Sequence, residues 1–157
     1  MLGTKVIEIE GRLVAIGPSV TSNAKTIYEY LDFETANGRF KTGKSAVSHN
    51  NDKHITVGAE GVFVLTRYLG RAVAMTIKDG DVEVNPIFRG LNWMHFLFPL
   101  VFFLVGLFFA PLWIITIPIW FLAGYFLILP SIVTGRLKTI ARKHGVSWKT
   151  ARKGVDF

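Results

Sequence analysis

The sequence contains no cysteine among its 157 residues. Disulfide frameworks, zinc sites with cysteine ligands and thiol catalysis are therefore excluded for these residues. The absence of cysteine fits a reducing compartment without fixing one. The first 20 residues also lack an apolar run, because charged side chains recur every few positions, and we expect no secretory signal peptide there.

Charge is missing from one long stretch of the chain. No Asp, Glu, Lys or Arg occurs in the 46 residues between Arg89 and Arg136. The chain is 50% hydrophobic with a mean hydropathy of +0.38, above the usual balance of a soluble domain. At 1.5 Å per residue, such a run makes roughly 69 Å of helix, which crosses a hydrocarbon core of about 30 Å twice. We therefore predict a transmembrane hairpin of two helices in residues 89–134.

The two spans of this hairpin are expected near residues 91–109 and 112–133. Ala110-Pro111 lies at the midpoint, and proline suits the first turn of a helix. Pro99 and Pro118 fall inside the spans and favour the alternative of a re-entrant hairpin that does not fully cross. Because no charged residue lies inside either span, the sequence lacks the usual mark of an ion or proton pathway.

Positive charge flanks the hairpin and is missing from its turn. The flanking cations are Arg89, Arg136, Lys138, Arg142 and Lys143. Positively charged flanks remain in the cytoplasm, so the sequence predicts a multi-pass protein of the cell inner membrane with both termini cytoplasmic. Residues 135–157 hold seven Lys and Arg and one Asp, a net charge of +6 out of +7. This segment is predicted to be a short, basic and partly helical cytoplasmic tail.

Residues 1–88 are predicted to form a small all-β domain. Apolar segments alternate with turn signals such as Asn37-Gly38 and Asp79-Gly80. The expected strands are 5–16 with a break near Gly11, 26–35, 39–41, 54–58, 62–69, 71–78 and 81–84. Five to seven antiparallel strands in about 80 residues predict an OB-like or SH3-like barrel, with a β-sandwich as the alternative.

Two of these strands carry more specific expectations. The segment from Val62 to Leu65 is apolar at every position, which predicts a strand buried on both faces. Val73, Met75 and Ile77 alternate with other residues, which predicts that these three side chains share one face of the sheet.

Two motifs resemble functional sites without the context that such sites need. Residues 38–45, GRFKTGKS, satisfy the phosphate-binding loop pattern, but we expect no helix after them to direct N–H groups at a phosphate. His49, Asp52 and His54 share a polar loop whose spacing matches no compact metal site, and we expect it to be solvated. We predict no catalytic residue, no cofactor and no metal site, and hence a protein that is not an enzyme.

Nucleic acid is a partner to consider because OB-like barrels often bind single strands on aromatic side chains beside a basic groove. The candidates for such a face are Tyr28, Tyr30, Phe40, Arg39 and Lys41. Residues 1–90 hold 11 basic and 10 acidic side chains, a net charge of +1. A domain that binds the phosphate backbone of nucleic acid usually carries a clear excess of positive charge, which residues 1–90 do not have. Nucleic acid is therefore the less favoured partner.

The tail contains a second resemblance. Residues 139–152, TIARKHGVSWKTAR, resemble the core of a helix-turn-helix in which Ala141 packs between the helices, Gly145 makes the turn and Ser147 caps the second helix. The resemblance implies that the second helix enters a DNA major groove. The tail departs from the family in having almost no chain after Arg152 for a third helix, and in starting within ten residues of a predicted span.

We favour another interpretation of the tail, as a basic segment beside the membrane. Ile140 and Trp148 are then expected to dip into the lipid interface while the cations face anionic headgroups, each contributing about 1 kcal/mol. The residues predicted to contact lipid or a partner are Arg89, Arg136, Lys138, Arg142, Lys143, Trp148, Lys149, Arg152 and Lys153.

These features together predict a non-enzymatic accessory or scaffold subunit of a membrane assembly, whose barrel is a protein–protein interaction module. The expected partners are anionic membrane lipid, another membrane or cytoplasmic protein, and a second copy of the chain in a homo-oligomer. Two alternatives remain open. One is a membrane-tethered nucleic-acid-binding protein that uses the tail, and the other is a small transport or pore subunit that uses the hairpin.

Reporter fusions test the predicted topology. A reporter that is active only in the cytoplasm should give signal at either terminus, because the cations flank both ends of the hairpin. A reporter that needs export should be silent at both. An export-positive signal at the N-terminus contradicts this topology.

Overall fold

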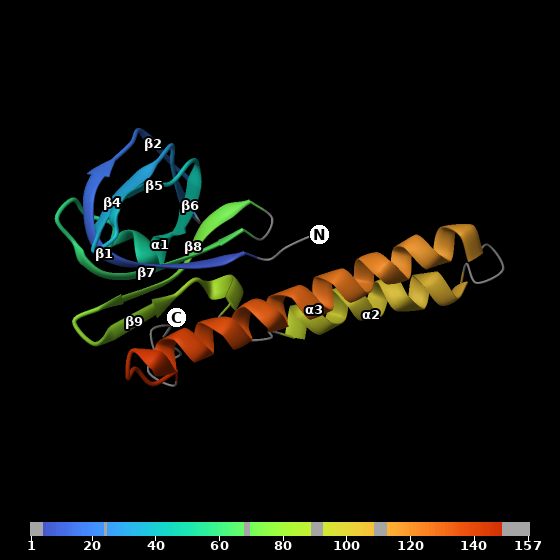
Figure 1. Ribbon diagram of the computed structural model, residues 1–157. Coiled ribbons are helices and arrows are strands. Elements are labelled where there is room, and N and C mark those ends of the chain that lie inside the picture. The colour runs from blue at the N-terminus through green and yellow to red at the C-terminus, as the bar shows by residue number, and fades with distance from the viewer. Residues whose placement is uncertain (1–4, 24, 68–69, 89–92, 109–112, 149–157) are drawn as a thin grey trace.

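A curled β-sheet occupies one end of the molecule, and two long helices extend away from it (Figure 1). The computed structural model describes residues 5–23, 25–67, 70–88, 93–108 and 113–148. The strands are β1 Val6–Ile16, β2 Ser19–Thr21, β3 Lys25–Tyr28, β4 Leu31–Thr35, β5 Gly38–Lys41, β6 Ser45–Ser48, β7 Glu60–Arg67, β8 Arg71–Lys78 and β9 Asp81–Val84. The helices are the short α1 His49–Asp52, the 3-10 turn η1 Pro86–Phe88, α2 Trp93–Phe108 and α3 Trp113–Lys143.

The strands form one sheet in the order β2-β3-β6-β8-β7-β1-β4-β5, with β9 beside β8. Neighbouring strands are antiparallel except β6 and β8, which meet in parallel where Ala46 pairs with Ala72. The chain runs from β3 into β4, and from β5 into β6, although these strands lie near opposite ends of the sheet order. The sheet therefore curls into a half-barrel, and the prediction of a small barrel-like β-domain is confirmed.

The strands differ from the prediction in four places. The expected strand 26–35 divides at Glu29-Tyr30 into β3 and β4, and the expected strand 54–58 consists of turns. The strand β2 was missed, and so was β6. Its terminal residues Ser45 and Ser48 are buried although they are polar, so β6 lacks the apolar alternation by which a strand is recognised.

The strand β7 lies between two hydrophobic clusters. Phe63 and Leu65 belong to an inner cluster inside the half-barrel, and the Phe63 ring lies 4.9 Å from that of Phe33. Val62 and Val64 belong to an outer cluster. The other buried members of the inner cluster are Ile9, Leu13, Tyr28, Leu31, Val47, Ile55, Ala59 and Val73. The prediction that this strand is buried on both faces is confirmed.

A β-bulge in β8 changes which side chains face the inside. Between paired positions β8 carries one residue, Ala74, more than β7. An extra residue interrupts the alternation of side chains. Val73 joins the inner cluster, whereas Met75 and Ile77 join the outer one. The prediction that these three side chains share one face is therefore wrong.

The C-terminal part of α3 covers the outer cluster. Val133, Leu137 and Ala141, spaced one helical turn apart, have no exposed surface and pack against the outer face of the barrel. The partly buried side chains at the margin are Val6, Ile140, Val146 and Trp148. Figure 1 shows α3 passing beneath β9 before it continues away from the sheet. Helix and barrel therefore share one hydrophobic core.

The 31 residues of α3 divide between two environments. From Trp113 to Ile132 the helix extends away from the barrel, and it exposes large apolar side chains there. Among the described residues, α3 is the one helix long and apolar enough to cross a membrane. α2 has 16 residues, fewer than the roughly 20 that a full span needs. The crossing of the bilayer by two spans stays a prediction.

A glycine ends α3. Gly145 has a φ of +70°, and its N–H donates to the carbonyl oxygen of Arg142 at 3.1 Å. The N–H of Val146 donates to the carbonyl oxygen of Ala141 at 2.9 Å. This pair of hydrogen bonds is the Schellman motif, in which glycine adopts the left-handed conformation at low cost. The chain turns back here, so that Val146 reaches the outer cluster.

The packing of residues 135–148 corrects two expectations about the tail. Ile140 and Trp148, expected to be free to dip into a lipid interface, are instead partly buried against the outer cluster. Ala141 packs against the barrel and not against a second helix. Gly145 makes the turn that the helix-turn-helix resemblance implies, whereas residues 149–152 of that motif lie outside the described part of the chain.

The helices α2 and α3 lie side by side and run in opposite directions (Figure 1). A Cβ added at Gly106 of α2 would clash with the indole of Trp120, and the Phe103 ring stacks on that indole at 5.5 Å. Trp120 lies inside the second predicted span, away from the lipid interfaces where tryptophan gathers. Its fit against Gly106 accounts for its position.

We expect Gly106→Val to push α2 away from α3, because the added side chain overpacks the site of Trp120 at a cost of about 1–3 kcal/mol. The thermal midpoint of the detergent-solubilised protein should fall by several degrees. Gly124→Val is the matched control, since nothing lies within 4 Å of a Cβ at Gly124. Equal midpoints for the two variants would contradict this packing.

Candidate functional site

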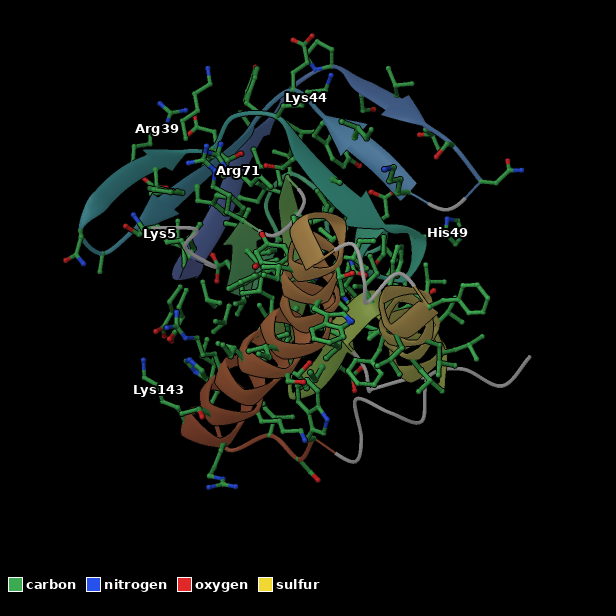
Figure 2. The ribbon with its side chains drawn as sticks, turned by 90° about the vertical axis from the view of Figure 1, so that its right-hand side faces the viewer. Lys5, Arg39, Lys44, His49, Arg71 and Lys143 are labelled. Atoms are coloured by element: carbon green, nitrogen blue, oxygen red, sulfur yellow. The ribbon has the colours of Figure 1, made fainter. Side chains whose placement is uncertain are left out.

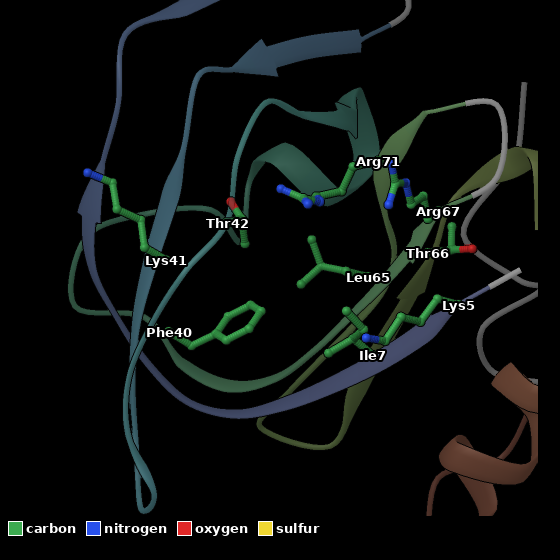
Figure 3. A pocket seen from close by; sticks show the side chains of 9 residues that line it. All are labelled: Lys5, Ile7, Phe40, Lys41, Thr42, Leu65, Thr66, Arg67 and Arg71. Carbon is green, nitrogen blue, oxygen red and sulfur yellow. The ribbon is translucent and has the colours of Figure 1, made fainter. Parts of the chain in front are cut away.

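Basic side chains gather on one side of the barrel. Figure 2 shows Lys5, Arg39, Lys44 and Arg71 on this side, beside the axis of α3. A pocket of about 130 Å³ opens among them, where β1 and β8 begin and β7 ends (Figure 3). Its lining residues are Lys5, Ile7, Phe40, Lys41, Thr42, Leu65, Thr66, Arg67 and Arg71.

Strand pairing brings three cations to this pocket. Arg67 ends β7 and Arg71 begins β8, and the two residues pair across the hairpin. The Arg67 N–H donates to the carbonyl oxygen of Lys5 at 3.0 Å, which holds the start of β1 beside the same hairpin. Figure 3 shows Arg71 and Lys5 reaching over the apolar base of the pocket from two sides. We refer to the site of Lys5, Arg67 and Arg71 as the basic pocket.

The basic pocket has no acidic lining residue in the described part of the chain. The salt bridges between described residues involve other groups than its three cations. Like charges held close together repel one another unless solvent or an anion screens them. Guanidinium groups also match the oxygens of a phosphate or carboxylate with two parallel N–H donors. The pocket thus has the charge and the donors to hold an anion.

The aromatic face considered for nucleic acid does not assemble. Tyr28 is buried, and its hydroxyl donates to Oδ1 of Asp52 at 2.7 Å. Burial, followed by this hydrogen bond, raises the pKa of Tyr28 above its ordinary value. Lys41 turns away from the pocket, and its Nζ lies 3.9 Å from the centre of the Tyr30 ring. Of the three candidate aromatic residues, Phe40 alone lines the pocket.

The loop with His49, Asp52 and His54 is solvated only in part, because His49 is exposed whereas Asp52 and His54 are partly buried. Asp52 accepts a second hydrogen bond from the Thr26 hydroxyl at 2.8 Å, and Asn51 has no exposed surface. Burial, assisted by a neighbouring lysine, lowers the pKa of His54. Asn51 and Asp52 hold α1 against the strands, and His49, Asp52 and His54 form no metal-binding cluster among the described residues.

Residues 38–45 do not form a phosphate-binding loop. They comprise β5, the connecting residues 42–44 and the first residue of β6, so no helix follows the motif directly. Thr42 instead joins two strands, because its hydroxyl accepts the Leu31 N–H at 2.9 Å and its own N–H donates to the Leu31 carbonyl oxygen at 2.8 Å. The match to the pattern therefore falls on a strand and on the short connection, residues 42–44, that leads to the next strand.

A polar cluster joins β1 to the end of α3. Glu8 Oε1 lies 2.8 Å from Lys143 Nζ and 2.7 Å from His144 Nε2. Burial opposes the ionisation of Glu8, but the two hydrogen bonds outweigh it and hold the pKa of Glu8 below its ordinary value. The hydrogen bond to Glu8 in turn raises the pKa of Lys143. Lys143, predicted to contact lipid or a partner, therefore contacts the barrel.

The same cluster has the donors of a metal site. Glu8, Glu10 and His144 place their ligand atoms within 4.8 Å of one another. The ammonium group of Lys143, bonded to Glu8, would repel a divalent cation bound among them. The cluster is best explained as a contact that fixes α3 on β1.

The other predicted lipid or partner contacts divide into two groups. Those outside the described residues are Arg89, Lys149, Arg152 and Lys153. Arg136, Lys138 and Arg142 are exposed on the docked part of α3. The Nζ of Lys138 lies 5.9 Å from the centre of the Trp148 ring. Contact of these cations with lipid stays a prediction.

The basic pocket was missed in the sequence. Lys5 and Arg67 are 62 positions apart and belong to no local motif. The available signal was weak, since it consisted of cations at or near the ends of three predicted strands. Only the pairing of β1 with β7 and of β7 with β8 brings them together.

The fold and the site define a protein with a barrel-like β-domain, a basic pocket at one end of it, and a helix apolar enough to cross a membrane. No protein-family model, curated protein or solved structure matched the chain. Only the geometry of the chain itself therefore bears on its function.

We expect Glu8→Gln to destabilise the docking of α3 by about 0.5–1 kcal/mol near neutral pH, the usual range for a partly exposed ion pair. The pKa of Glu8 is lower in the folded state than in the unfolded state, so its contribution is present above the ordinary glutamate pKa. It is lost as the pH falls through the folded value. Unfolding midpoints of wild type and variant should differ at about pH 7 and converge once the pH has fallen below the lowered pKa of Glu8 in the folded state.

The exposed Glu29 provides the control for this measurement, because Glu29→Gln removes the same charge away from α3. A difference between wild type and Glu8→Gln that persisted in acid would argue against the ion pair. A loss of stability as large in Glu29→Gln would do so too.

Proposed function

We propose that the chain is a membrane-anchored, non-enzymatic protein whose barrel is a recognition module at the cytoplasmic surface of the inner membrane. In this role it is an accessory or scaffold subunit that presents the barrel to a partner protein. The observation that carries the proposal is the division of α3 into an exposed apolar segment and a segment docked on the barrel.

The lengths of the two segments of α3 support this role. At 1.5 Å per residue, the roughly 20 residues before Val133 make about 30 Å of helix, the thickness of a hydrocarbon core. Phe121 and Ile128 in this segment are 77% and 59% exposed, which favours lipid over water around them. Docking begins at Val133, so the barrel sits directly at the headgroups and has no flexible tether.

The topology we propose has two crossings with both termini cytoplasmic. α2 lies antiparallel to α3, and its exposed side chains are apolar as well. The uncharged sequence continues on both sides of α2, which supplies the few further residues that a full span needs. The cations before and after the hairpin favour the cytoplasmic side for both ends.

We also propose that the barrel is OB-like. If β3–β4 and β5–β6 are counted as two bent strands, the barrel has five strands together with β1, β7 and β8. Three further features support the assignment: β1 pairs with both β4 and β7, β6 and β8 meet in parallel, and α1 lies between β6 and β7. Barrels of this type use one face and the adjoining loops to bind extended ligands.

The surface we assign to a partner is the groove between the first half of β1 and the β4–β5 hairpin. From Val6 to Glu10, β1 pairs with β7, and its pairing with β4 begins at Gly11. A groove of about 780 Å³ lies along this half of the strand, with Arg39 on its far side. An extended segment of a partner protein can join such a strand edge by backbone hydrogen bonds.

Nucleic acid is the second candidate partner, because the basic pocket combines three cations with Phe40. Against it, Tyr28 is buried and the Tyr30 ring faces Lys41, so that successive bases lack a row of stacking partners. A protein partner therefore remains the better supported proposal.

Photo-crosslinking in membranes tests the proposed function. A photoreactive amino acid at Ala36, which lines the groove, should give a discrete protein adduct in the fraction that resists alkaline extraction. The same amino acid at Val20, 74% exposed on β2, is the control and should give none. Release of the protein by alkali contradicts membrane anchoring. Equal adducts at both positions, or an adduct with nucleic acid at Ala36, contradict the assigned partner surface.

A further inference from the structure

The basic pocket lies level with the point where α3 leaves its apolar segment. Val6, the neighbour of Lys5, lines a surface cleft together with Ile132 and Gly135 of α3. Ile132 directly precedes the docked segment of the helix. In Figure 1 the start of β1, the end of β7 and the start of β8 lie on the side of the barrel toward which α2 and α3 extend. With α3 across a bilayer, these elements are at the height of the lipid headgroups.

The size and lining of the basic pocket match one phosphate group. Its volume of about 130 Å³ is well below the roughly 300–1,000 Å³ of sites that enclose a whole small molecule. Two guanidinium groups and one ammonium group supply donors for phosphate oxygens. Ile7 and Leu65 form the base of the pocket and Phe40 one wall, and these apolar surfaces suit the glycerol and first methylene groups of a lipid.

We propose that the basic pocket binds the phosphate of an anionic phospholipid in the cytoplasmic leaflet. This inference rests on the proposed function, because it requires the barrel to lie beside a bilayer. A phosphate is common to lipids, inorganic phosphate and nucleic acids, and the position of the pocket next to the apolar segment of α3 favours the lipid. The pocket is also too small to hold a nucleobase together with its phosphate.

The bound lipid gives the barrel a second attachment to the membrane. The first is α3, which docks on the outer face of β7, β8 and β9. Viewed along the helices, Lys5 and Arg71 lie to one side of α3 (Figure 2). The hairpin of α2 and α3 by itself leaves the barrel free to tilt with the axis of α3 relative to the plane of the bilayer. A phosphate contact away from that axis fixes which face of the barrel is turned from the membrane.

Native mass spectrometry of the full-length protein in mild detergent tests the proposal with phosphatidylglycerol as the probe. We expect wild type to retain one phosphatidylglycerol in preference to phosphatidylcholine. Arg67→Gln/Arg71→Gln should bind it at least about tenfold more weakly, because it removes charge-assisted hydrogen bonds. Arg67→Lys/Arg71→Lys keeps the charge without the forked donors and should bind with intermediate affinity.

The matched control is Lys25→Gln/Lys78→Gln. It removes the same charge from the barrel, and Lys78 lies at the opposite end of β8 from Arg71, about 23 Å away along the strand. This variant should bind phosphatidylglycerol as wild type does. An equal loss in the control would overturn the proposal, because net charge and not the pocket would then explain the binding.

Two competition arms identify the source of the phosphate. Inorganic phosphate and a short single-stranded oligothymidine should each displace phosphatidylglycerol poorly. Displacement by inorganic phosphate at the concentration of the lipid would reassign the pocket to a soluble anion. Binding of the oligonucleotide that depends on Arg67 and Arg71 and exceeds lipid binding would reassign it to nucleic acid.

Alkaline extraction of the same variants distinguishes a failure of the proposed membrane anchoring from a failure of the proposed lipid site. Release of wild type from the membrane means that the proposed function itself fails. Retention in the membrane, combined with unchanged lipid binding in Arg67→Gln/Arg71→Gln, means that the lipid site fails while the membrane anchor stands.

Discussion

The packing of Val133, Leu137 and Ala141 onto the outer face of the barrel is the contact on which the rest of the structure depends. Without it, the apolar side chains on the outside of β7, β8 and β9 would form one contiguous patch in water. Each large apolar side chain that is fully buried contributes about 1.5–3 kcal/mol. The same contact gives the barrel a fixed position on the helix, because it belongs to a close-packed core and not to a linker.

Polar contacts orient the helix on the surface that the apolar contacts create. Glu8 on β1 forms salt bridges with Lys143 and His144 at the end of α3. The Schellman motif at Gly145 then turns the chain back, so that Val146 packs against the outer cluster. Hydrophobic contacts are not directional. Hydrogen bonds are directional, so these form only when α3 has one particular rotation about its own axis. The orientation in turn decides which end of the barrel points along the apolar segment of α3. That end carries the basic pocket.

Much of the fold could be predicted from local patterns, and the failures have specific physical causes. The apolar run from Val62 to Leu65 correctly predicted two buried faces, but the pattern does not say that the second face is covered by α3. The alternation of Val73 with Met75 failed because a bulge at Ala74 is set by the pairing with β7. β6 was missed because its buried residues Ser45 and Ser48 are polar and look like loop residues in a sequence.

The sequence by itself determined the uncharged run, the barrel-like β-domain and the basic character of the C-terminal segment. Each of these follows from neighbouring residues, whose hydrophobicity, charge and turn preference act locally. The tertiary structure alone decided that the segment after the apolar run packs on the barrel, and that Lys5, Arg67 and Arg71 form one site. Both depend on contacts between residues far apart in the chain, and such contacts arise from strand register and from the shape of the surfaces that fold together.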